Sequence, residues 1–371
     1  MGLKFRGGGF NLFRPEVILI GAISGLTILG LVVLLSVTQA SAFFVKQIIF
    51  LGIAVSAGGI FTFLNLETLR KGAWGVGIAS GLGLLAVLLV GKEVKGAQRW
   101  IDLGLINIQV SEFAKLALIF VLAHYLATQQ RCLKTFRKGF LIPTVIVVGT
   151  AGLITLQPDF GTAFLSGAVG FTMLFMAGVS LVYLIPMLLT GTACFAVAIC
   201  LDPVRFERIT AFLNLEAYKT DSAYQLYQSI LAFGAGGVTG VGLGNGRQQI
   251  AFLPEAHTDF IFPIIGEELG IGFTVSVTVL FLAIFILGLS ALRRAPNLFQ
   301  FLLALGALLL ITLQALLNIG VTTGCLPTKG LSLPFISYGG SNLVLMFTLA
   351  GILLNCFRSW ARPAVIRPQE L

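Results

Sequence analysis

Long apolar stretches recur along the whole chain, separated by polar segments that are mostly short. A helix that crosses a bilayer takes about 20 mostly apolar residues, and these stretches are of that order. They cover residues 17–37, 43–64, 73–91, 112–127, 140–156, 162–178, 181–200, 259–290, 299–320 and 340–357. The pattern predicts an all-α polytopic membrane protein of about ten transmembrane helices, with a single membrane domain over residues 1–371.

Two of the connecting segments are much longer than the others. Residues 91–111 precede the fourth predicted helix, and residues 201–258 form a large loop between helices 7 and 8. Both are polar and contain aromatic residues and glycines. Long loops of this kind often carry binding and catalytic residues.

The composition agrees with lipid as the solvent. Of the 371 residues, 57% are hydrophobic and only 11% are charged, and the mean hydropathy is +0.98. The net charge of +9 comes from short basic clusters between apolar stretches, so we predict no nucleic-acid partner. The five cysteines show no disulfide or metal-binding spacing.

The charges are distributed unequally between alternate connections. With a cytoplasmic N-terminus, 14 of the 24 basic residues lie in cytoplasmic segments: Lys4, Arg6, Arg14, Arg70, Lys71, Arg131, Lys134, Arg137, Lys138, Arg293, Arg294, Arg358, Arg362 and Arg367. Twelve of the 15 acidic residues then lie on the outer side. This bias predicts that residues 1–16 and 358–371 are cytoplasmic tails and that 201–258 is extracytoplasmic.

The segment 251–272 gathers acidic residues at the entry to a predicted helix. Glu255, His257 and Asp259 come first, and Glu267 and Glu268 follow inside the apolar stretch, where a charge must be paired or hydrated. In one continuous helix Glu267 falls within about 80° of Asp259 and Glu268 falls opposite. Two interpretations remain open: a shared cavity, or a helix cap at Thr258 or Asp259 with the glutamates bonded to a neighbouring helix.

A second cluster lies between residues 96 and 115. Ser111 is predicted to cap a helix, which would place Glu112 and Lys115 on one helical face. Arg99 and Lys115 could present positive charge to an anionic head group at the outer surface. Alternatively, Glu112 and Lys115 simply neutralise each other within the membrane.

Two further loops on the same side carry candidate residues. Asp159, in LQPDFGT, is either a turn cap or part of the same surface. The segment 322–342 contains Lys329, and its prolines and glycines predict irregular backbone, which is tolerated among spans only when buried or lining a wet cavity. The N–H groups near Gly339 and Gly340 could form an anion-binding nest.

These motifs together resemble the SEDS family of peptidoglycan polymerases along nearly the whole chain. The resemblance rests on RWIDLG, QVSEFAKLAL, LQPDFGT, LPEAHTDFIF and LPTKGLSLPFISYGGSN. Within the family, LPEAHTDFIF, PTKG and PFISYGGS resemble the cell-division subfamily more than the elongation subfamily. Val110 stands where a proline is usual, and Asn342 where a second serine is common.

The resemblance implies glycosyl transfer from lipid II, a polyisoprenoid pyrophosphate-linked disaccharide-pentapeptide, to a growing glycan strand. It implies Asp259 as the general base that deprotonates the acceptor hydroxyl, with Glu255 as the second choice. The residues expected to bind substrate or pyrophosphate are Arg99, Glu112, Lys115, Asp159, Lys329, Ser337, Gly339, Gly340 and Ser341. A divalent cation, Mg²⁺ or Mn²⁺, is compatible with carboxylates around a pyrophosphate, and no metal ligand is assigned.

The same resemblance implies a location and partners. We expect the bacterial cytoplasmic membrane at the division septum, a single-span class B penicillin-binding protein as transpeptidase partner, and other divisome proteins. The alternatives are an elongation-type polymerase, a lipid II flippase or transporter, and a scaffold without chemistry.

Overall fold

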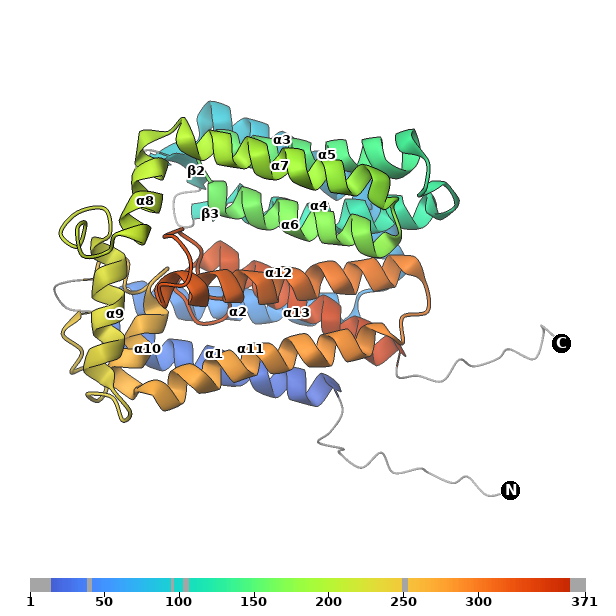
Figure 1. Ribbon diagram of the computed structural model, residues 1–371. Helices are drawn as coiled ribbons and strands as arrows, with labels where there is room; N and C mark the ends of the chain where they lie inside the picture. Colours follow the sequence, from blue (N-terminus) through green and yellow to red (C-terminus); the bar gives the residue numbers. More distant parts are fainter. Residues whose placement is uncertain (1–14, 39–41, 95–96, 103–106, 249–252, 361–371) are drawn as a thin grey trace, which may run out of the picture.

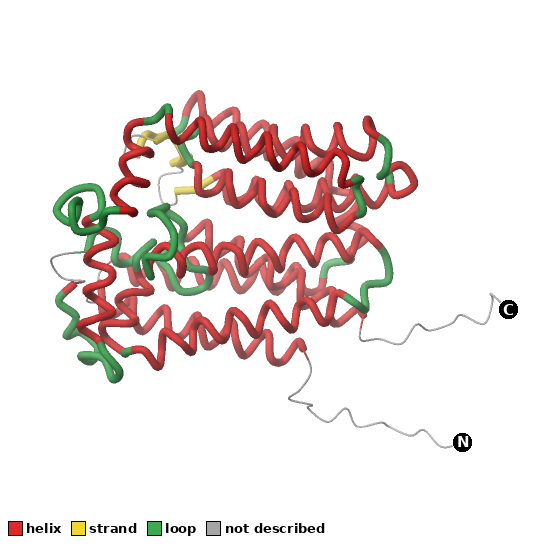
Figure 2. The backbone as a smooth tube through the Cα atoms, in the orientation of Figure 1, coloured by secondary structure: helices red, strands yellow, loops and turns green. Residues whose placement is uncertain are grey.

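A bundle of long helices makes up most of the molecule in the computed structural model, which describes residues 15–38, 42–94, 97–102, 107–248 and 253–360 (Figures 1 and 2). Ten helices of the described chain are long and apolar enough to cross a membrane, which confirms the predicted fold class. They are α1 (Pro15–Thr38), α2 (Ala42–Phe63), α3 (Leu66–Val90), α4 (Val110–Thr128), a π-helical turn (Phe136–Leu141) continuing into α5 (Ile142–Leu156), α6 (Phe160–Ala177), α7 (Leu181–Cys200), α11 (Ile271–Leu292), α12 (Leu298–Thr322) and α13 (Gly340–Trp360).

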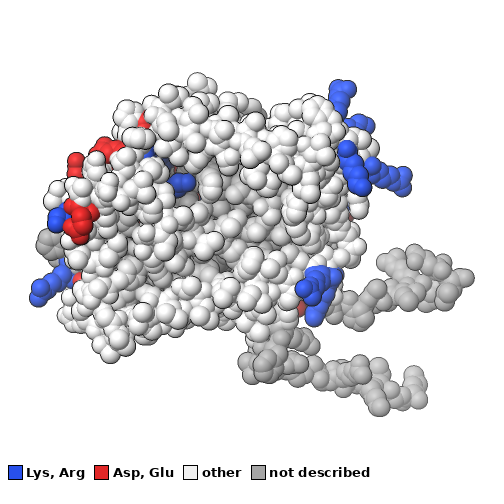
Figure 3. Space-filling model, in the orientation of Figure 1, with Lys and Arg blue, Asp and Glu red and all other residues white. Residues whose placement is uncertain are grey.

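The two ends of the bundle differ. Helix α1 begins and α13 ends at one end, which we call the terminus end (Figure 1). The other, the loop end, carries β1 (Lys92–Val94), β2 (Ala97–Asp102), β3 (Asn107–Gln109), α8 (Pro203–Leu213), α9 (Tyr224–Gly236), α10 (Ile261–Leu269) and the segment 323–339. On the face shown in Figure 3, acidic side chains gather mainly at the loop end, and basic ones stand out at the terminus end.

The segment 91–111 is not an irregular loop. It contains a three-stranded antiparallel sheet of order β1-β2-β3, in which Trp100 pairs with Gln109. Strand β3 runs directly into α4, whose N-cap is Gln109 without a side-chain hydrogen bond. The predicted cap at Ser111 is therefore wrong, because Ser111 lies buried within the first turn of the helix.

The predicted continuous helix over 259–290 is also wrong. It is broken at Gly270, whose φ of +79° favours glycine, into the short α10 and the spanning α11. A β-carbon on Gly270 would collide with the carbonyl oxygen of Val238, and Ile271 donates its N–H to the carbonyl of Gly237. The chain after α9 thus packs into the break and keeps α10 at the loop end.

Helices α2 and α13, far apart in the sequence, pack closely together. A β-carbon on Gly351 of α13 would collide with the backbone of Gly58 in α2, and one on Gly58 would meet the carbonyl oxygen of Phe347. Small residues let two helix backbones approach this closely in a membrane. Helices α4, α12 and α13 are mostly buried and form the core on which the loop end rests.

Candidate functional site

The acidic segment after the large loop folds into a tight turn over residues 254–260, directly before α10. The backbone N–H groups of Thr258 and Phe260 donate to the carbonyl oxygen of Glu255, at 3.1 and 3.3 Å. Glu255 has a φ of 61°, a left-handed conformation that non-glycine residues seldom adopt and that clusters at functional sites. Its carboxylate also accepts a 2.8 Å hydrogen bond from the Thr258 hydroxyl. The turn therefore holds Glu255 in a defined, strained conformation.

Asp259 lies at the end of this turn and outside the helix. The N-cap of α10 is Phe260, whose own side chain makes no capping hydrogen bond, so the prediction that Thr258 or Asp259 is the N-cap residue is wrong. Asn318 of α12 donates from its Nδ2 to the carbonyl oxygen of Asp259 at 2.8 Å and to that of Leu331 at 2.6 Å. This one buried amide joins the acidic turn to the loop between α12 and α13.

The same loop brings a glycine against the Asp259 carboxylate. A β-carbon on Gly330 would lie 2.9 Å from Oδ2 of Asp259, closer than real β-carbons come to other atoms. Glycine marks such close approaches because any side chain would displace the neighbour. The position of the carboxylate therefore depends on Gly330.

Lys329, directly before Gly330, lies over two aromatic rings. Its Nζ is 4.3 Å from the ring centroid of Phe164 in α6 and 5.0 Å from that of Phe195 in α7. Within the described chain it makes no hydrogen bond or ion pair. Burial lowers the pKa of Lys329. A partly desolvated ammonium resting on ring faces still has its three donors available for an anion.

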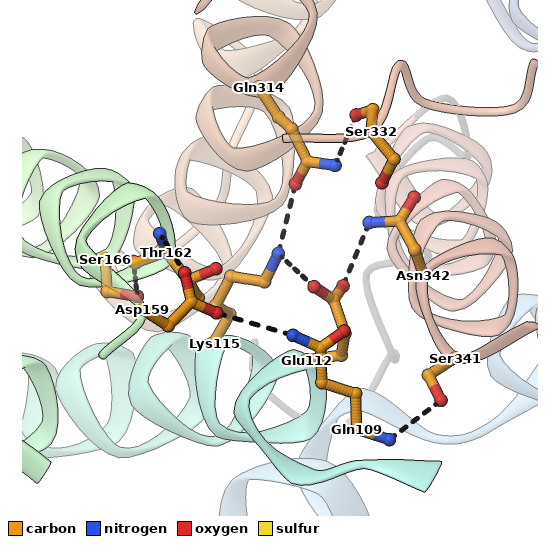
Figure 4. Close-up of polar contacts among 10 residues, drawn as sticks. All are labelled: Gln109, Glu112, Lys115, Asp159, Thr162, Ser166, Gln314, Ser332, Ser341 and Asn342. Carbon is orange, nitrogen blue, oxygen red and sulfur yellow. Dashed lines mark hydrogen bonds and ion pairs between the residues drawn. The ribbon is translucent and has the colours of Figure 1, made fainter. Parts of the chain in front are cut away.

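A buried polar network links α4, α12 and α13 (Figure 4). Lys115 and Glu112 form an ion pair of 3.0 Å, and their side chains are 1% and 6% exposed. The amine also donates to Oε1 of Gln314 at 3.0 Å, while Asn342 donates to Glu112 at 2.9 Å. Gln314 in turn donates to the carbonyl of Ser332 at 2.9 Å. The predicted surface position of Lys115 is therefore wrong, and the alternative of a self-neutralising pair matches the structure.

Asp159 and Arg99 also make contacts within the fold. Asp159 is the N-cap of α6, accepting from the N–H of Thr162 at 3.1 Å, as in the capping alternative. Its Oδ2 is 3.4 Å from the Nε2 of Gln109. The half-buried Arg99 side chain donates to the carbonyl oxygens of the two residues before Asp159, at 3.1 and 2.6 Å. Arg99 thus fastens the sheet to the turn before α6.

One donor of the predicted anion nest before α13 is already bonded within the protein. The N–H of Gly339 donates to Oε1 of Gln47 in α2, at 3.3 Å. Gly340 packs so closely against the ring of Phe50 that a β-carbon would collide with it. These two glycines allow α13 to approach α2, and the Gly339 N–H already has its acceptor.

Two serines of the same motif have partners inside the protein as well. The hydroxyl oxygen of Ser337 accepts from the N–H of Leu333 at 2.7 Å, and that of Ser341 accepts from the N–H of Gln109 at 3.1 Å. Ser337 shapes the loop between α12 and α13, and Ser341 ties α13 to the end of β3.

Glu267 and Glu268 hold the large loop in place. Glu267 accepts from the N–H groups of residues 247 and 248, at 2.8 and 3.2 Å. Oε1 of Glu268 accepts from Ser36 of α1 at 2.6 Å and from the N–H of Gly244 at 2.8 Å. The alternative of a bond to a neighbouring helix is therefore confirmed for Glu268, and Glu267 stabilises the loop.

Several residues that shape this region escaped the sequence analysis. Gln47, Gln314 and Asn318 are amides inside apolar stretches, and the last two are four residues apart, on one face of a helix. Polar residues at such depth usually bond to another helix or to irregular backbone, so this signal was present. Gly330 carried no signal, because only the fold brings Asp259 next to it.

Comparison with known proteins places the chain in context. The profile of the FtsW/RodA/SpoVE family, described as cell cycle protein, matches residues 12–361. A probable peptidoglycan glycosyltransferase FtsW of Coxiella burnetii is 40% identical over 323 residues, covering 84% of this chain and 86% of that protein. A probable peptidoglycan glycosyltransferase FtsW of Trichlorobacter lovleyi is 38% identical over 360 residues, covering 93% and 94%.

Solved structures share the fold. A chain from a peptidoglycan synthase complex, described as coordinating polymerization and crosslinking, superposes with a TM-score of 0.79 at 26% identity, covering 93% of this chain and 98% of that one. The Thermus thermophilus rod shape determining protein RodA superposes with a TM-score of 0.71 at 26% identity, covering 93% and 97%.

Proposed function

Because this chain belongs to the FtsW/RodA/SpoVE family, we propose that it is a peptidoglycan glycosyltransferase of septal wall synthesis, which extends glycan strands with disaccharide units from lipid II. The observation that carries the proposal is the arrangement around Asp259. The Asp259 carboxylate packs against Gly330, and Asn318 donates a hydrogen bond to the Asp259 carbonyl oxygen. Lys329, the residue directly before Gly330, brings its ammonium group to the same region.

In this proposal Asp259 is the general base. The 4-hydroxyl oxygen of the acceptor sugar attacks the anomeric carbon of the donor, and the bond from that carbon to the pyrophosphate oxygen breaks with inversion. The hydroxyl proton passes to the Asp259 carboxylate, and the lipid pyrophosphate leaves. A positioned base of this kind typically contributes about 10²–10⁴-fold to the rate. Glu255, in the same turn, is the second choice.

Lys329 is the cation best placed to bind the donor pyrophosphate, since Lys115 is enclosed with Glu112, and Nε and Nη2 of Arg99 donate to carbonyl oxygens. The aromatic rings below Lys329 belong to α6 and α7, and Phe164 is 41% exposed. An apolar lipid tail can lie along such a face while its phosphates contact the amine.

The divalent cation of this proposal takes its ligands mainly from the substrate. The described residues contain no group of three or more His, Cys, Asp or Glu side chains that could hold a metal ion. We therefore assign any Mg²⁺ or Mn²⁺ to the pyrophosphate of the substrate, where phosphate oxygens are the natural ligands.

For orientation, we propose that the loop end faces outward and that both termini are cytoplasmic. The gathering of acidic side chains at the loop end and of basic side chains at the terminus end supports this assignment.

The partner is proposed to be a class B penicillin-binding protein, because a structural neighbour belongs to a synthase complex described as coordinating polymerization and crosslinking. Other divisome proteins at the septum complete the expected assembly.

Two alternatives have less support. A lipid II flippase would need ionisable residues along a path, but Glu112, Glu267 and Glu268 each accept hydrogen bonds that hold the fold together. An elongation-type polymerase agrees less well with relatives of about 40% identity that are named FtsW. The third alternative, a scaffold without catalytic activity, is distinguished from a polymerase by the assay described next.

The decisive experiment gives purified protein, with its transpeptidase partner and a divalent cation, labelled lipid II and resolves the products on a gel. The wild type should yield a glycan ladder. Asp259→Asn should be expressed and bind the partner normally yet make almost no glycan, whereas Asp259→Glu should retain a little. Substantial polymer from the purified Asn variant would end the assignment of Asp259, and a wild type without polymer would favour the scaffold or flippase.

A further inference from the structure

A pocket opens at the terminus end, at the opposite end of the bundle from Asp259. Its volume is ≈ 330 Å³, and it lies between the end of α2, the start of α3, the start of α12 and the end of α13. Its lining comes from described residues of these helices and of the turn between α2 and α3. Ligand sites usually occupy about 300–1,000 Å³. None of the roles described above uses this pocket.

Two arginines line the pocket, and neither has a strong counter-ion. The Cζ atom of Arg358 lies 4.5 Å from the ring centroid of Phe63, and its Nη2 donates to the carbonyl oxygen of Thr62 at 3.1 Å. Arg358 makes no ion pair with any side chain that the structure describes. Arg70 is paired with Glu67 at 3.5 Å, but these side chains are 38% and 54% exposed, and exposed pairs are weak. Positive charge is therefore in excess among the lining residues.

The backbone around the pocket adds little negative charge to oppose an anion. The buried side chain of Asn355 donates to the carbonyl oxygens of Phe61 and Leu64, at 2.8 and 2.6 Å. Together with the bond from Arg358, these contacts satisfy three carbonyl groups at the end of α2. The start of α12, capped by Asn297, also lines the pocket, and the first N–H groups of a helix carry partial positive charge.

We propose that this pocket, named here the arginine pocket, binds the phosphate of an anionic phospholipid head group in the leaflet at the terminus end. The inference is independent of the proposed catalytic function. Each guanidinium has five N–H donors, of which the contacts above use only a few, and arginine matches phosphate oxygens with paired donors. Basic pockets between membrane helices on the cytoplasmic side are a recurrent kind of head-group site.

An apolar strip beside the pocket favours a lipid over a soluble phosphate. Phe63 at the edge of the pocket is 73% exposed, and Ile60, three residues earlier on the same face of α2, is 60% exposed. Trp74, one turn beyond Arg70 on α3, is exposed as well. An acyl chain can lie along these side chains while its phosphate contacts the arginines. A soluble phosphate would gain nothing from the strip.

The test measures lipid binding to the purified full-length protein in detergent by native mass spectrometry. Short-chain phosphatidylglycerol should bind more tightly than phosphatidylcholine of the same chain length, because only the former carries a net negative charge. Arg70→Gln should weaken the binding of phosphatidylglycerol about tenfold, the usual scale for a lost charge-assisted hydrogen bond. The matched control is Arg137→Gln, which removes an exposed cation outside the pocket and should leave this affinity unchanged.

A variant with the opposite expected sign separates anion binding from a structural role of the arginines. Glu67→Gln removes the carboxylate that competes for Arg70, so it should tighten the binding of phosphatidylglycerol about two- to fivefold. Arg358→Gln should weaken binding about tenfold, but it also loses the bond to Thr62. The melting temperature of each variant without lipid identifies any loss of folding.

Two results would overturn the proposal directly. One is equal affinity of the wild type for phosphatidylglycerol and phosphatidylcholine, and the other is wild-type affinity in the combined Arg70→Gln and Arg358→Gln variant. Competition distinguishes other anions from a lipid. Inorganic phosphate or a glutamate-rich peptide that displaces phosphatidylglycerol at equal concentration would assign the pocket to a soluble phosphate or to an acidic protein segment, and the lipid assignment would fall.

Discussion

Lys115 and Lys329 both lie at the loop end, yet their surroundings are opposite in kind. The amine of Lys115 is enclosed between the carboxylate of Glu112 and the amide oxygen of Gln314, and only 1% of the residue is exposed. The amine of Lys329 rests on two aromatic rings, without an ion pair in the described chain. A buried charge whose partners come from the protein serves the fold, whereas one that lacks them can serve a ligand.

Removing one member of the enclosed pair should have the largest effect on stability. In Lys115→Met the Glu112 carboxylate stays buried without its counter-ion, which typically costs about 3–5 kcal/mol. We expect a clearly lowered melting temperature in detergent, with much of the loss recovered by combining Lys115→Met with Glu112→Gln. A single variant that melts like the wild type would mean that the pair does not stabilise the fold.

Displacing the Asp259 carboxylate should have the next largest effect, a loss of catalytic rate. Gly330→Ala places a β-carbon against Oδ2 of Asp259, and a misplacement of about 1 Å can cost roughly 10²-fold in rate. We expect kcat for glycan synthesis to fall by about 10–100-fold with little change in melting temperature.

The matched control is Gly272→Ala on α11, where an added β-carbon meets nothing within 4 Å. It should retain wild-type kcat. Equal kcat values for Gly330→Ala and Gly272→Ala would show that catalysis does not depend on the close packing of Gly330 against Asp259.

The pH dependence of kcat/KM should report on Lys329, the lysine proposed to bind the substrate. Because burial lowers the pKa of Lys329, its ammonium loses its proton at a lower pH than an ordinary lysine, whose pKa is about 10.4. As pH rises through that lowered pKa, kcat/KM for lipid II should fall, since the cation for the pyrophosphate disappears. Lys329→Arg should remove this alkaline limb because the guanidinium stays charged.

Lys329→Gln should raise KM about tenfold at neutral pH, the usual scale for a lost charge-assisted hydrogen bond. Lys134→Gln, an exposed lysine between α4 and α5, serves as the control and should behave as the wild type. An unchanged alkaline limb in Lys329→Arg would assign the titration to another group.

The smallest effect is expected from two cysteine substitutions that test whether the loop end, which carries both lysines, faces the outside of the cell. In a cysteine-free background, Thr220→Cys in the large loop should react with an impermeant thiol reagent added from outside, and Thr135→Cys between α4 and α5 should not. The reverse pattern would invert the proposed topology. Neither substitution is expected to alter activity.

Much of the fold could be predicted because a lipid solvent makes hydrophobic length the dominant signal. The ion pair of Glu112 and Lys115 could also be predicted, since residues three apart share a helical face. The break at Gly270 could not, because the apolar pattern continues through it and the packing residue, Val238, comes from another part of the chain. The contact between Asp259 and Gly330 likewise depends on two loops that only the folded bundle brings together.

The close packing of α2 against α13 has a consequence for how the protein is made. The backbones of Gly58 in α2 and Gly351 in α13 are in contact. Helix α2 therefore leaves the ribosome early, whereas α13, against which it packs, is synthesised near the end. At about 5–20 residues per second, nearly 300 residues take on the order of 15–60 seconds to synthesise. During that time the inner face of α2 must be shielded by lipid or by the insertion machinery. A nascent chain cut short before α13 would leave its own beginning unassembled, so errors late in translation should expose the earliest helices to membrane proteases.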